Sequence, residues 1–337
     1  MKRLAFVVQL VCVLLVGANV VSAQQDWSKV EIKATRVAGS VYMLEGAGGN
    51  IGVTVGDDGI LIVDDQYAPL ADKIRAALKN IGEGKHLRFV LNTHWHGDHT
   101  GSNAQFGREA SIIAHTNVRK RLSTEQRLSL FNETVPASPK EALPIITFDE
   151  SLSVHFNGEE IRAVHFPHSH TDGDSVIFFT GSNVVHMGDN FFAGKFPFVD
   201  LDSGGSVEGM TRNVADIISK LPAGVKIIPG HGPLSTVEDL RQYQAMLTET
   251  TAIVRQRIAA GKTLTQIKAE GLPEKWKTWG TGFIKTDFWL ETIHRSLSKT
   301  TRSDKQNKRH PAKTTSKTNK SAKNGNTKHW HPHGHTH

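Results

Sequence analysis

The stretch Asn92-Thr93-His94-Trp95-His96-Gly97-Asp98-His99 places three histidines and one aspartate within six positions. So many imidazole and carboxylate groups are costly to crowd into one short loop unless a divalent cation neutralises them. They are also side chains that zinc accepts as ligands. One ion cannot use all four from so short a loop, so the pattern HxHxDH predicts a site for two metal ions. Two-metal sites are typical of hydrolysis.

Three further candidate ligands lie in the second half of the chain. His170, Asp189 and His231 each come after a predicted strand. Side chains that follow separate strands can converge on one site. For Asp189 and His231 the alternative is a role in a turn. His165 and His168 are rivals of His170.

Four other aspartates lie beside these candidates. Asp64 and Asp65 follow a predicted strand and either orient a ligand imidazole or form a turn. Asp172 and Asp174 lie just after His170 and are candidates for contacts behind the ligands.

The first 23 residues predict a secretory signal. Lys2 and Arg3 precede the apolar stretch 4–21, and small residues follow up to Ala23. We expect cleavage before Gln24, no transmembrane anchor afterwards, and a periplasmic or secreted protein; the alternative is a retained anchor. The single cysteine, Cys12, lies inside this segment, so the mature chain offers no thiol to a metal.

Charge is spread unevenly along the chain. Residues 299–337 contain ten Lys and Arg against one acidic residue, Asp304, whereas residues 24–298 are net acidic. The basic character therefore belongs to the C-terminal end. An acidic core argues against nucleic acid as a partner and favours a small-molecule substrate.

Residues 24–298 are expected to form one domain with C-terminal helices. In both halves of the chain, segments with the apolar spacing of strands alternate with segments that have the apolar spacing of helices. The pattern predicts two stacked sheets with helices outside. Strands are expected at 41–44, 51–55, 59–64, 89–92, 112–115, 152–156, 161–165, 175–179, 184–187 and 226–229, and helices at 68–80, 116–127 and 207–221. A capping box at 235–238 is expected to begin a helix that reaches about residue 260.

Residues 299–337 are predicted to be disordered, because large apolar residues almost vanish there. Five histidines alternate with other residues from His329 to His337. Such tracts bind divalent metals loosely. The histidine tract either captures metal ions and raises their concentration near the predicted metal site, or it has no part in metal binding there.

With these motifs, the chain resembles the metallo-β-lactamase superfamily over roughly residues 30–245. The resemblance implies a four-layer αββα sandwich of the α/β class and two Zn²⁺ ions, with iron or manganese as alternatives at the second site. It implies His170 rather than its rivals, because the family histidine directly precedes Thr-Asp. It assigns His94, His96 and His170 to the first site, Asp98, His99 and His231 to the second, and Asp189 to a bridge between them.

The resemblance also implies a mechanism. A hydroxide that bridges the ions attacks a carbonyl carbon, and Asp98 acts as the catalytic residue that helps to protonate the leaving group. Phe192 and Lys195 follow Asp189 and are candidates for substrate binding; the alternative is a buried aromatic cluster with a solvated lysine. Trp95 either faces the pocket or packs beneath the metals.

Some residues of this chain depart from the family pattern, and these departures reduce the number of possible substrate classes without leaving a single one. The mature chain lacks the cysteine that some zinc β-lactamases have at the bridging position. Asp189 instead looks like the bridge of glyoxalase II, lactonases and alkylsulfatases, although Ser102 stands where glyoxalase II usually has glycine. We therefore expect a β-lactamase-like hydrolase with promiscuous β-lactamase activity, a lactonase or a thioester hydrolase. A non-catalytic periplasmic metal-binding protein and a nuclease are rival classes. The oligomeric state is left open.

Overall fold

The computed structural model describes residues 25–309. The predicted signal peptide, its cleavage point and the histidine tract lie outside the described residues. Among those that are described, no helix is both long and apolar enough to cross a membrane.

The first sheet has seven strands, in the order β1-β2-β3-β4-β5-β6-β9. Neighbouring strands are antiparallel from β1 to β4, and the rest run parallel, with helices in the connections. The strands are β1 (Lys33–Ala38), β2 (Val41–Glu45), β3 (Ile51–Gly56), β4 (Gly59–Val63), β5 (Leu87–Leu91), β6 (Ser111–His115) and β9 (Ile146–Phe148). The helices of this half are α1 (Ala71–Ile81), α2 (Gly97–Thr100), α3 (Asn103–Phe106) and α4 (Thr116–Leu122).

The second sheet has five strands, in the order β10-β11-β12-β13-β14. Only its last pair is parallel, because helix α5 connects those strands. The strands are β10 (Ser151–Phe156), β11 (Glu159–His165), β12 (Ser175–Phe179), β13 (Val184–His186) and β14 (Lys226–Ile228). The helices are α5 (Val207–Lys220), α6 (Val237–Ala259), α7 (Leu264–Glu270), the 3₁₀ helix η5 (Glu274–Thr281) and α8 (Thr286–Arg309).

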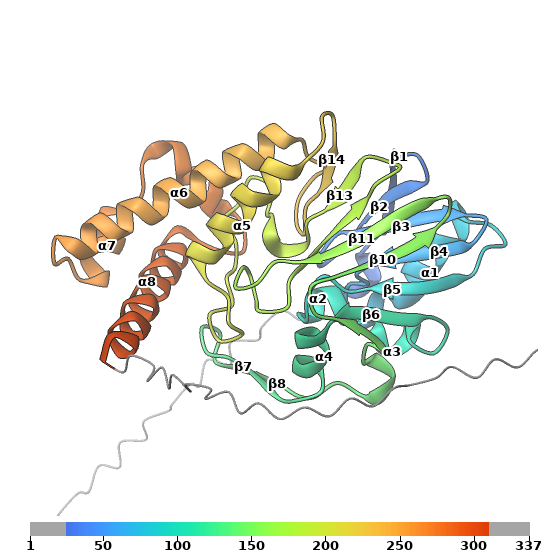
Figure 1. Ribbon diagram of the computed structural model, residues 1–337, viewed down its shortest axis with the longest axis horizontal. Helices are drawn as coiled ribbons and strands as arrows, with labels where there is room; N and C mark the ends of the chain where they lie inside the picture. Colours follow the sequence, from blue (N-terminus) through green and yellow to red (C-terminus); the bar gives the residue numbers. More distant parts are fainter. Residues whose placement is uncertain (1–24, 310–337) are drawn as a thin grey trace, which may run out of the picture. The chain divides into compact units, whose positions relative to one another are not determined.

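Three apolar clusters join these elements into layers. One lies between the sheets and includes Leu61 and Leu91 from the first sheet and Ile177 and Ile228 from the second. A second packs α1 on the first sheet. A third packs α5, α6 and α8 on the second sheet, and these helices gather on one side in Figure 1. The predicted αββα sandwich is therefore confirmed.

The predicted helix at 116–127 is wrong in its second half. Helix α4 ends at Leu122, and the chain turns into the two-stranded hairpin β7 (Gln126–Leu128) and β8 (Glu133–Val135). Ser123 and Thr124 bond through their hydroxyls to the carbonyl of Lys120. Such side-chain bonds compete with helix continuation, and pairing in the hairpin satisfies the backbone beyond them.

The capping box of α6 lies one residue later than predicted. Thr236 is the N-cap, and Asp239 returns the bond. Ser235 cannot serve as the cap, because its backbone pairs with Ile227.

Disorder is predicted from residue 299 onward, and residues 310–337 of that stretch lie outside the described residues. The compact unit that contains both sheets ends at Leu297, yet helix α8 continues to Arg309. No glycine or proline occurs between Thr286 and Arg309, and Pro311 is the first residue beyond that cannot continue a helix. An established helix extends readily through such a segment even without apolar residues, because elongation needs no new nucleus.

Candidate metal centre

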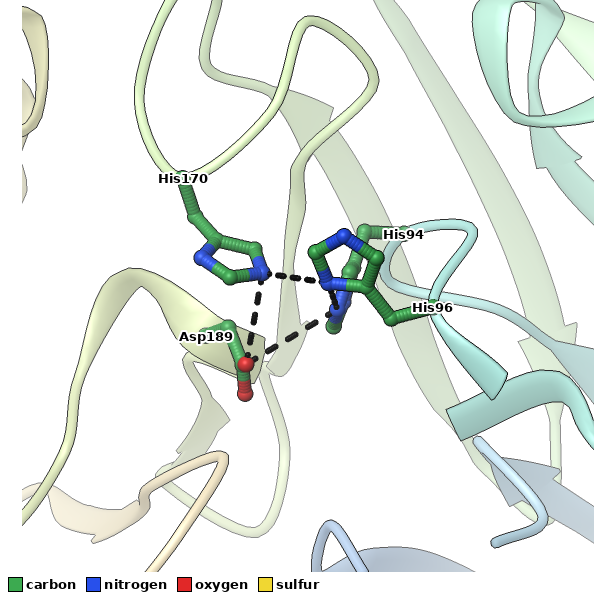
Figure 2. Close-up of side chains that lie close together, drawn as sticks. All are labelled: His94, His96, His170 and Asp189. Carbon is green, nitrogen blue, oxygen red and sulfur yellow. Dashed lines mark hydrogen bonds and ion pairs between the residues drawn. The ribbon is translucent and has the colours of Figure 1, made fainter. Parts of the chain in front are cut away.

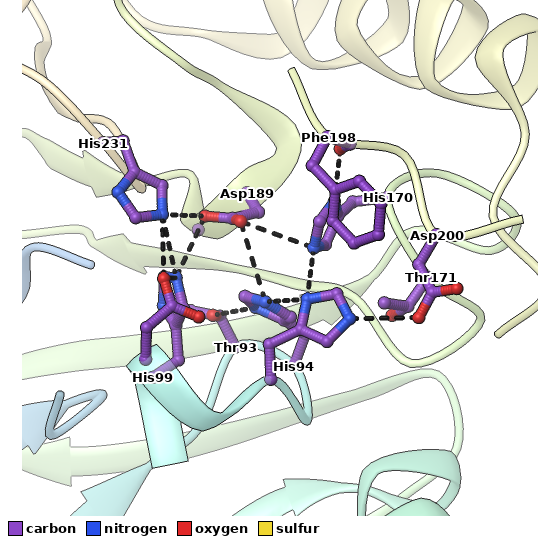
Figure 3. Close-up of polar contacts among 12 residues, drawn as sticks. Thr93, His94, His99, His170, Thr171, Asp189, Phe198, Asp200 and His231 are labelled. Carbon is purple, nitrogen blue, oxygen red and sulfur yellow. Dashed lines mark hydrogen bonds and ion pairs between the residues drawn. The ribbon is translucent and has the colours of Figure 1, made fainter. Parts of the chain in front are cut away.

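The seven predicted ligands lie together in two neighbouring groups, and Figures 2 and 3 show side chains of these groups pointing toward one another. Four come from the loop and short helix after β5, and the others follow β11, β13 and β14. They form two groups in which all candidate ligand atoms lie within 4.8 Å of one another. The groups are His94, His96, His170 and Asp189, and Asp98, His99 and His231.

The first group is a compact set of ring nitrogens (Figure 2). Nδ1 of His96 lies 3.1 Å from Nε2 of His94 and 2.8 Å from Nε2 of His170. Oδ2 of Asp189 lies 3.4 Å from His170 and 3.8 Å from His94. Tetrahedral zinc holds nitrogen about 2.0–2.1 Å away, which places neighbouring ligand atoms about 3.3 Å apart. The spacing is therefore that of ligands around one ion.

The second group shares Asp189 with the first. Nε2 of His231 lies 3.2 Å from Oδ2 of Asp98 and 3.4 Å from Nε2 of His99. Oδ1 of Asp189 lies 3.1 Å from His99 and 3.4 Å from His231. One oxygen of Asp189 thus faces each group, as a bridging carboxylate requires.

Acceptors behind the rings determine which nitrogen faces inward. Nδ1 of His170 donates to the carbonyl of Phe198 at 2.7 Å, and Nε2 of His96 lies 3.0 Å from Asp200 (Figure 3). Nδ1 of His99 lies 2.8 Å from Asp64. A neutral imidazole that donates on one side presents a lone pair on the other. The inward nitrogens of these three rings are therefore ready to bind metal.

His94 is oriented through a relay. Thr93 donates its hydroxyl proton to Asp64 at 2.7 Å, so its oxygen can accept from Nδ1 of His94 at 3.0 Å. Asp64 thereby supports ligands of both groups. It is buried at the end of β4, with φ of 65°, a left-handed conformation that aspartate tolerates better than most residues.

A cation fits this arrangement. Lone pairs on nitrogens 2.8–3.1 Å apart repel one another unless a positive charge lies among them. Oδ1 of Asp189 is buried and receives no hydrogen bond from any described residue, although Nε2 of His99 is close. Both features are explained if metal ions lie among these atoms.

The electrostatics agree with that view. Burial lowers the pKa of His170 to about 4, so this ring is neutral at pH 7. Burial also disfavours the charged form of His231, but Asp189 and Asp98 outweigh it and raise the pKa to about 9. Burial raises the pKa of Asp98, yet the charges of His99 and His231 lower it further, so Asp98 is ionised. Carboxylates that hold a proton on a histidine can equally hold a metal there.

The rivals of His170 do not reach the cluster. His165 stacks on His115 with ring centroids 3.7 Å apart and bonds to the carbonyl of Asp174. His168 is exposed and lies 3.2 Å from the carbonyl of Gly204. His165 ends strand β11 and His168 lies in the loop that follows, so neither belongs to the ligand groups.

The remaining acidic candidates have different roles. Asp174 accepts two bonds from Thr171 and so holds the loop of His170. Asp65 accepts from the backbone N–H of Ser102, and its own backbone N–H donates to the carbonyl of His99 at 2.8 Å, so it holds the backbone of that ligand rather than its ring. Asp172 forms an ion pair with Arg121 at 2.7 Å, away from the cluster.

Asp200 and Thr93 were missed in the sequence. Asp200 lies in Val199-Asp200-Leu201, where no local pattern marks it. Thr93 belongs to the opening stretch, and its relay to His94 depends on Asp64, which is far away in sequence.

A cavity of about 590 Å³ opens onto the cluster. His96, Asp98, Asp189 and His231 form part of its wall, and aromatic side chains form much of the rest. Phe192 and Lys195, the two predicted substrate-binding residues, also line it. Trp95 was expected either to face the pocket or to pack beneath the metals. In the structure it lines the cavity and also packs against buried residues of β6 and α4.

Comparison with known proteins agrees with this geometry. Residues 38–231 match the family described as the metallo-beta-lactamase superfamily. Among curated proteins, the 2,4-dinitroanisole O-demethylase subunit alpha of Nocardioides sp. (strain JS1661) is 29% identical over 144 residues. That alignment covers 41% of this chain and 40% of the relative, so the chain spans less than half of that protein.

Two kinds of solved structure share the fold. The DIM-1 metallo-beta-lactamase is 17% identical, with a TM-score of 0.53, over 66% of this chain and 99% of that one. The sec-alkylsulfatase Pisa1 from Pseudomonas sp. is 15% identical, with a TM-score of 0.58, over 78% of this chain and 50% of that one. At these identities the likeness concerns the fold alone.

Proposed function

The chain belongs to the metallo-β-lactamase superfamily, and we propose that it is a secreted hydrolase that binds two zinc ions and cleaves a small carbonyl substrate. The observation that carries the proposal is the division of the Asp189 carboxylate, whose oxygens face separate ligand groups. Storage of metal does not need such a shared carboxylate. A cavity of about 590 Å³ that opens onto it gives a substrate room to bind.

The ligand roles follow from the two groups. His94, His96 and His170 would hold one ion, Asp98, His99 and His231 the other, and Asp189 both. Zinc suits these imidazole and carboxylate groups, and iron or manganese are alternatives at the second, oxygen-richer position. When bound, two such ions lower the pKa of water and polarise the substrate carbonyl.

Side chains of this protein would manage the proton and the water. Asp98 is ionised and lines the cavity, so it can accept a hydrogen bond from a water and hold that water where it can give its proton to the leaving group. Phe192 stacks on His231 with centroids 5.1 Å apart and covers one side of that ligand from solvent. Lys195 is exposed at the wall and offers a positive charge to a substrate carboxylate.

The substrate class remains a choice among β-lactams, lactones and thioesters. A substrate panel decides it: a chromogenic cephalosporin, a lactone, a thioester and a sulfate ester, each tested on zinc-loaded protein with and without chelator. We expect chelation to abolish turnover. Bound metal without turnover of any substrate would favour the rival proposal, a non-catalytic periplasmic metal-binding protein.

His96→Ala tests the site itself, with zinc per chain measured by mass spectrometry beside turnover. We expect metal and activity to fall together. His155→Ala is the matched control, since this histidine is exposed on β10 and lies outside both ligand groups. Full turnover by His96→Ala would contradict the assignment.

A further inference from the structure

A row of aromatic rings leads from the candidate ligands toward the mouth of the cavity. The ring of Phe198 lies 5.6 Å from that of His96 and 5.0 Å from that of Phe131. Phe283 continues the row, 5.5 Å from Phe131. All four residues line the same cavity. The row therefore forms a continuous apolar strip on the cavity wall that begins at the metal cluster.

The outer half of this row comes from two separate segments. Phe131 lies in the turn between β7 and β8, and Phe283 lies in the loop between η5 and α8. The loop is beyond residue 231, where the family match ends. The same two segments add Leu128, Val135 and Ile284 to the cavity lining. The outer half of the row thus combines a hairpin inside the matched region with a loop beyond it.

Phe283 is unusually exposed for its size. Its relative exposure is 78%, the highest among the large exposed hydrophobic side chains of residues 25–299. An exposed aromatic ring at a cavity mouth, rather than on open surface, is typical of a binding site. The ring gains contact area when a ligand covers it.

The loop that carries Phe283 is firmly anchored. The backbone N–H of Phe196 donates to the carbonyl of Trp279 at 3.1 Å, and the ring of Phe196 stacks on buried Trp289. Phe131 stacks on Phe288 at 5.4 Å with an interplanar angle of 12°. The backbone that carries the exposed ring is therefore held on both flanks, as a preformed subsite requires.

We propose that this row is a subsite for an apolar arm of the substrate, an alkyl chain or an aryl ring carried next to the scissile carbonyl group. The inference rests on the proposed hydrolase activity and names its substrate class. Outside the ligand groups, the described residues of the lining include only two of acidic or basic type, Lys195 and Glu133. Because the row itself consists of aromatic rings, it favours methylene groups over charged groups of a ligand. Each methylene that leaves water for such a strip should raise kcat/KM about threefold.

Two substrate series test the proposal on zinc-loaded, full-length protein. One is p-nitrophenyl acetate, butyrate, hexanoate and octanoate, in which the arm is on the acyl side. The other is γ-butyrolactone and γ-octalactone, in which the arm is on the alkoxy side. We expect kcat/KM to rise along at least one series. Flat profiles in both would overturn the proposal; if neither series is turned over, the binding measurement described below decides it.

Variants locate the effect in the row. Phe283→Ala and Phe131→Ala should each lower kcat/KM for the longest arms about tenfold and leave the acetate ester or the unsubstituted lactone nearly unchanged. Ile145→Ala is the matched control, because Ile145 is 71% exposed and lies outside the cavity. Thermal unfolding of each variant confirms that it folds. Equal chain-length dependence in all variants and wild type would overturn the proposal.

A binding measurement separates the subsite from catalysis. Calorimetric titration of metal-free protein with hexanoate and octanoate needs no turnover. We expect octanoate to bind more tightly than hexanoate in wild type and in Ile145→Ala, and this preference to be lost in Phe283→Ala. Binding that is independent of Phe283 would count against the subsite even if the enzyme is active.

Discussion

Asp64 lies 2.8 Å from Nδ1 of His99 and holds that ring with Nε2 toward the candidate metal site. The same carboxylate accepts the backbone N–H and the hydroxyl of Thr93, both at 2.7 Å. Thr93 in turn orients His94. A single buried residue at the end of β4 therefore sets the direction of one ligand in each group.

Asp64→Asn should weaken zinc binding about 10-fold to 100-fold while the protein stays folded. Asparagine tolerates the left-handed backbone at this position, where φ is 65°. The asparagine amide cannot accept from the backbone N–H and hydroxyl of Thr93 and from Nδ1 of His99 together, because its NH₂ group is itself a donor. Competition with a chromogenic chelator measures the affinity. Asp72→Asn is the control, since Asp72 is almost fully exposed on α1; equal affinity in the two variants would count against the role of Asp64.

Asp189→Ala should lower metal content at both positions, whereas His231→Ala should lower it at one. The reason is geometric, because Asp189 presents Oδ2 to the first group and Oδ1 to the second. Metal per chain, measured by mass spectrometry after dialysis against dilute zinc, should approach zero in the first variant and one in the second. Retention of two ions by Asp189→Ala would rule out the bridge.

Much of the metal site was predictable because its residues are concentrated in sequence. The opening stretch contains four candidate ligands whose spacing already requires a cation. Asp189 and His231 follow strands, and the strand pattern predicts that they converge. The αββα sandwich follows from the same alternation of strand and helix patterns.

The supporting residues were harder to predict, because their roles exist only in three dimensions. Asp200 meets His96 across 104 positions of sequence, and nothing near it in the chain marks it. Phe131 lies beyond the helix predicted at 116–127, in the turn of a hairpin that the sequence pattern did not predict. Phe283 comes to the cavity because the elements on either side of it, η5 and α8, both contact Phe196.

Stability should fall as the pH drops from about 6.5 toward 4, in part because of His165. Burial, followed by the neighbouring His115, lowers the pKa of His165 to about 4 in the folded protein. As the pH falls, the unfolded chain therefore takes up a proton at about pH 6.5, before the folded protein does. Proton uptake by the unfolded chain lowers the free energy of unfolding, so the stability present above pH 6.5 is lost below that pH. After allowance for the ring's partial exposure, we expect a loss of about 1–2 kcal/mol.

His165→Asn isolates that contribution. The asparagine amide can keep the bond that Nδ1 makes to the carbonyl of Asp174, but it does not titrate. Denaturant unfolding of metal-free protein at pH 7.5 and pH 5.0 should show a smaller pH effect in the variant than in wild type. Because His115 is retained, its own titration affects both proteins. The same pH dependence in both would exclude His165 as a source.

Gly49→Ala should disturb the metal site without altering any ligand. A Cβ at Gly49 would lie 2.1 Å from Cε1 of His99, and that ring cannot retreat freely because Asp64 holds its other side. Overpacking of this kind costs about 1–3 kcal/mol, so we expect weaker zinc binding and a lower Tm. Gly97→Ala is the matched control within the ligand loop, since a Cβ there would meet nothing within 4 Å. If both variants bind zinc like wild type, the close packing of Gly49 on His99 does not constrain that ligand.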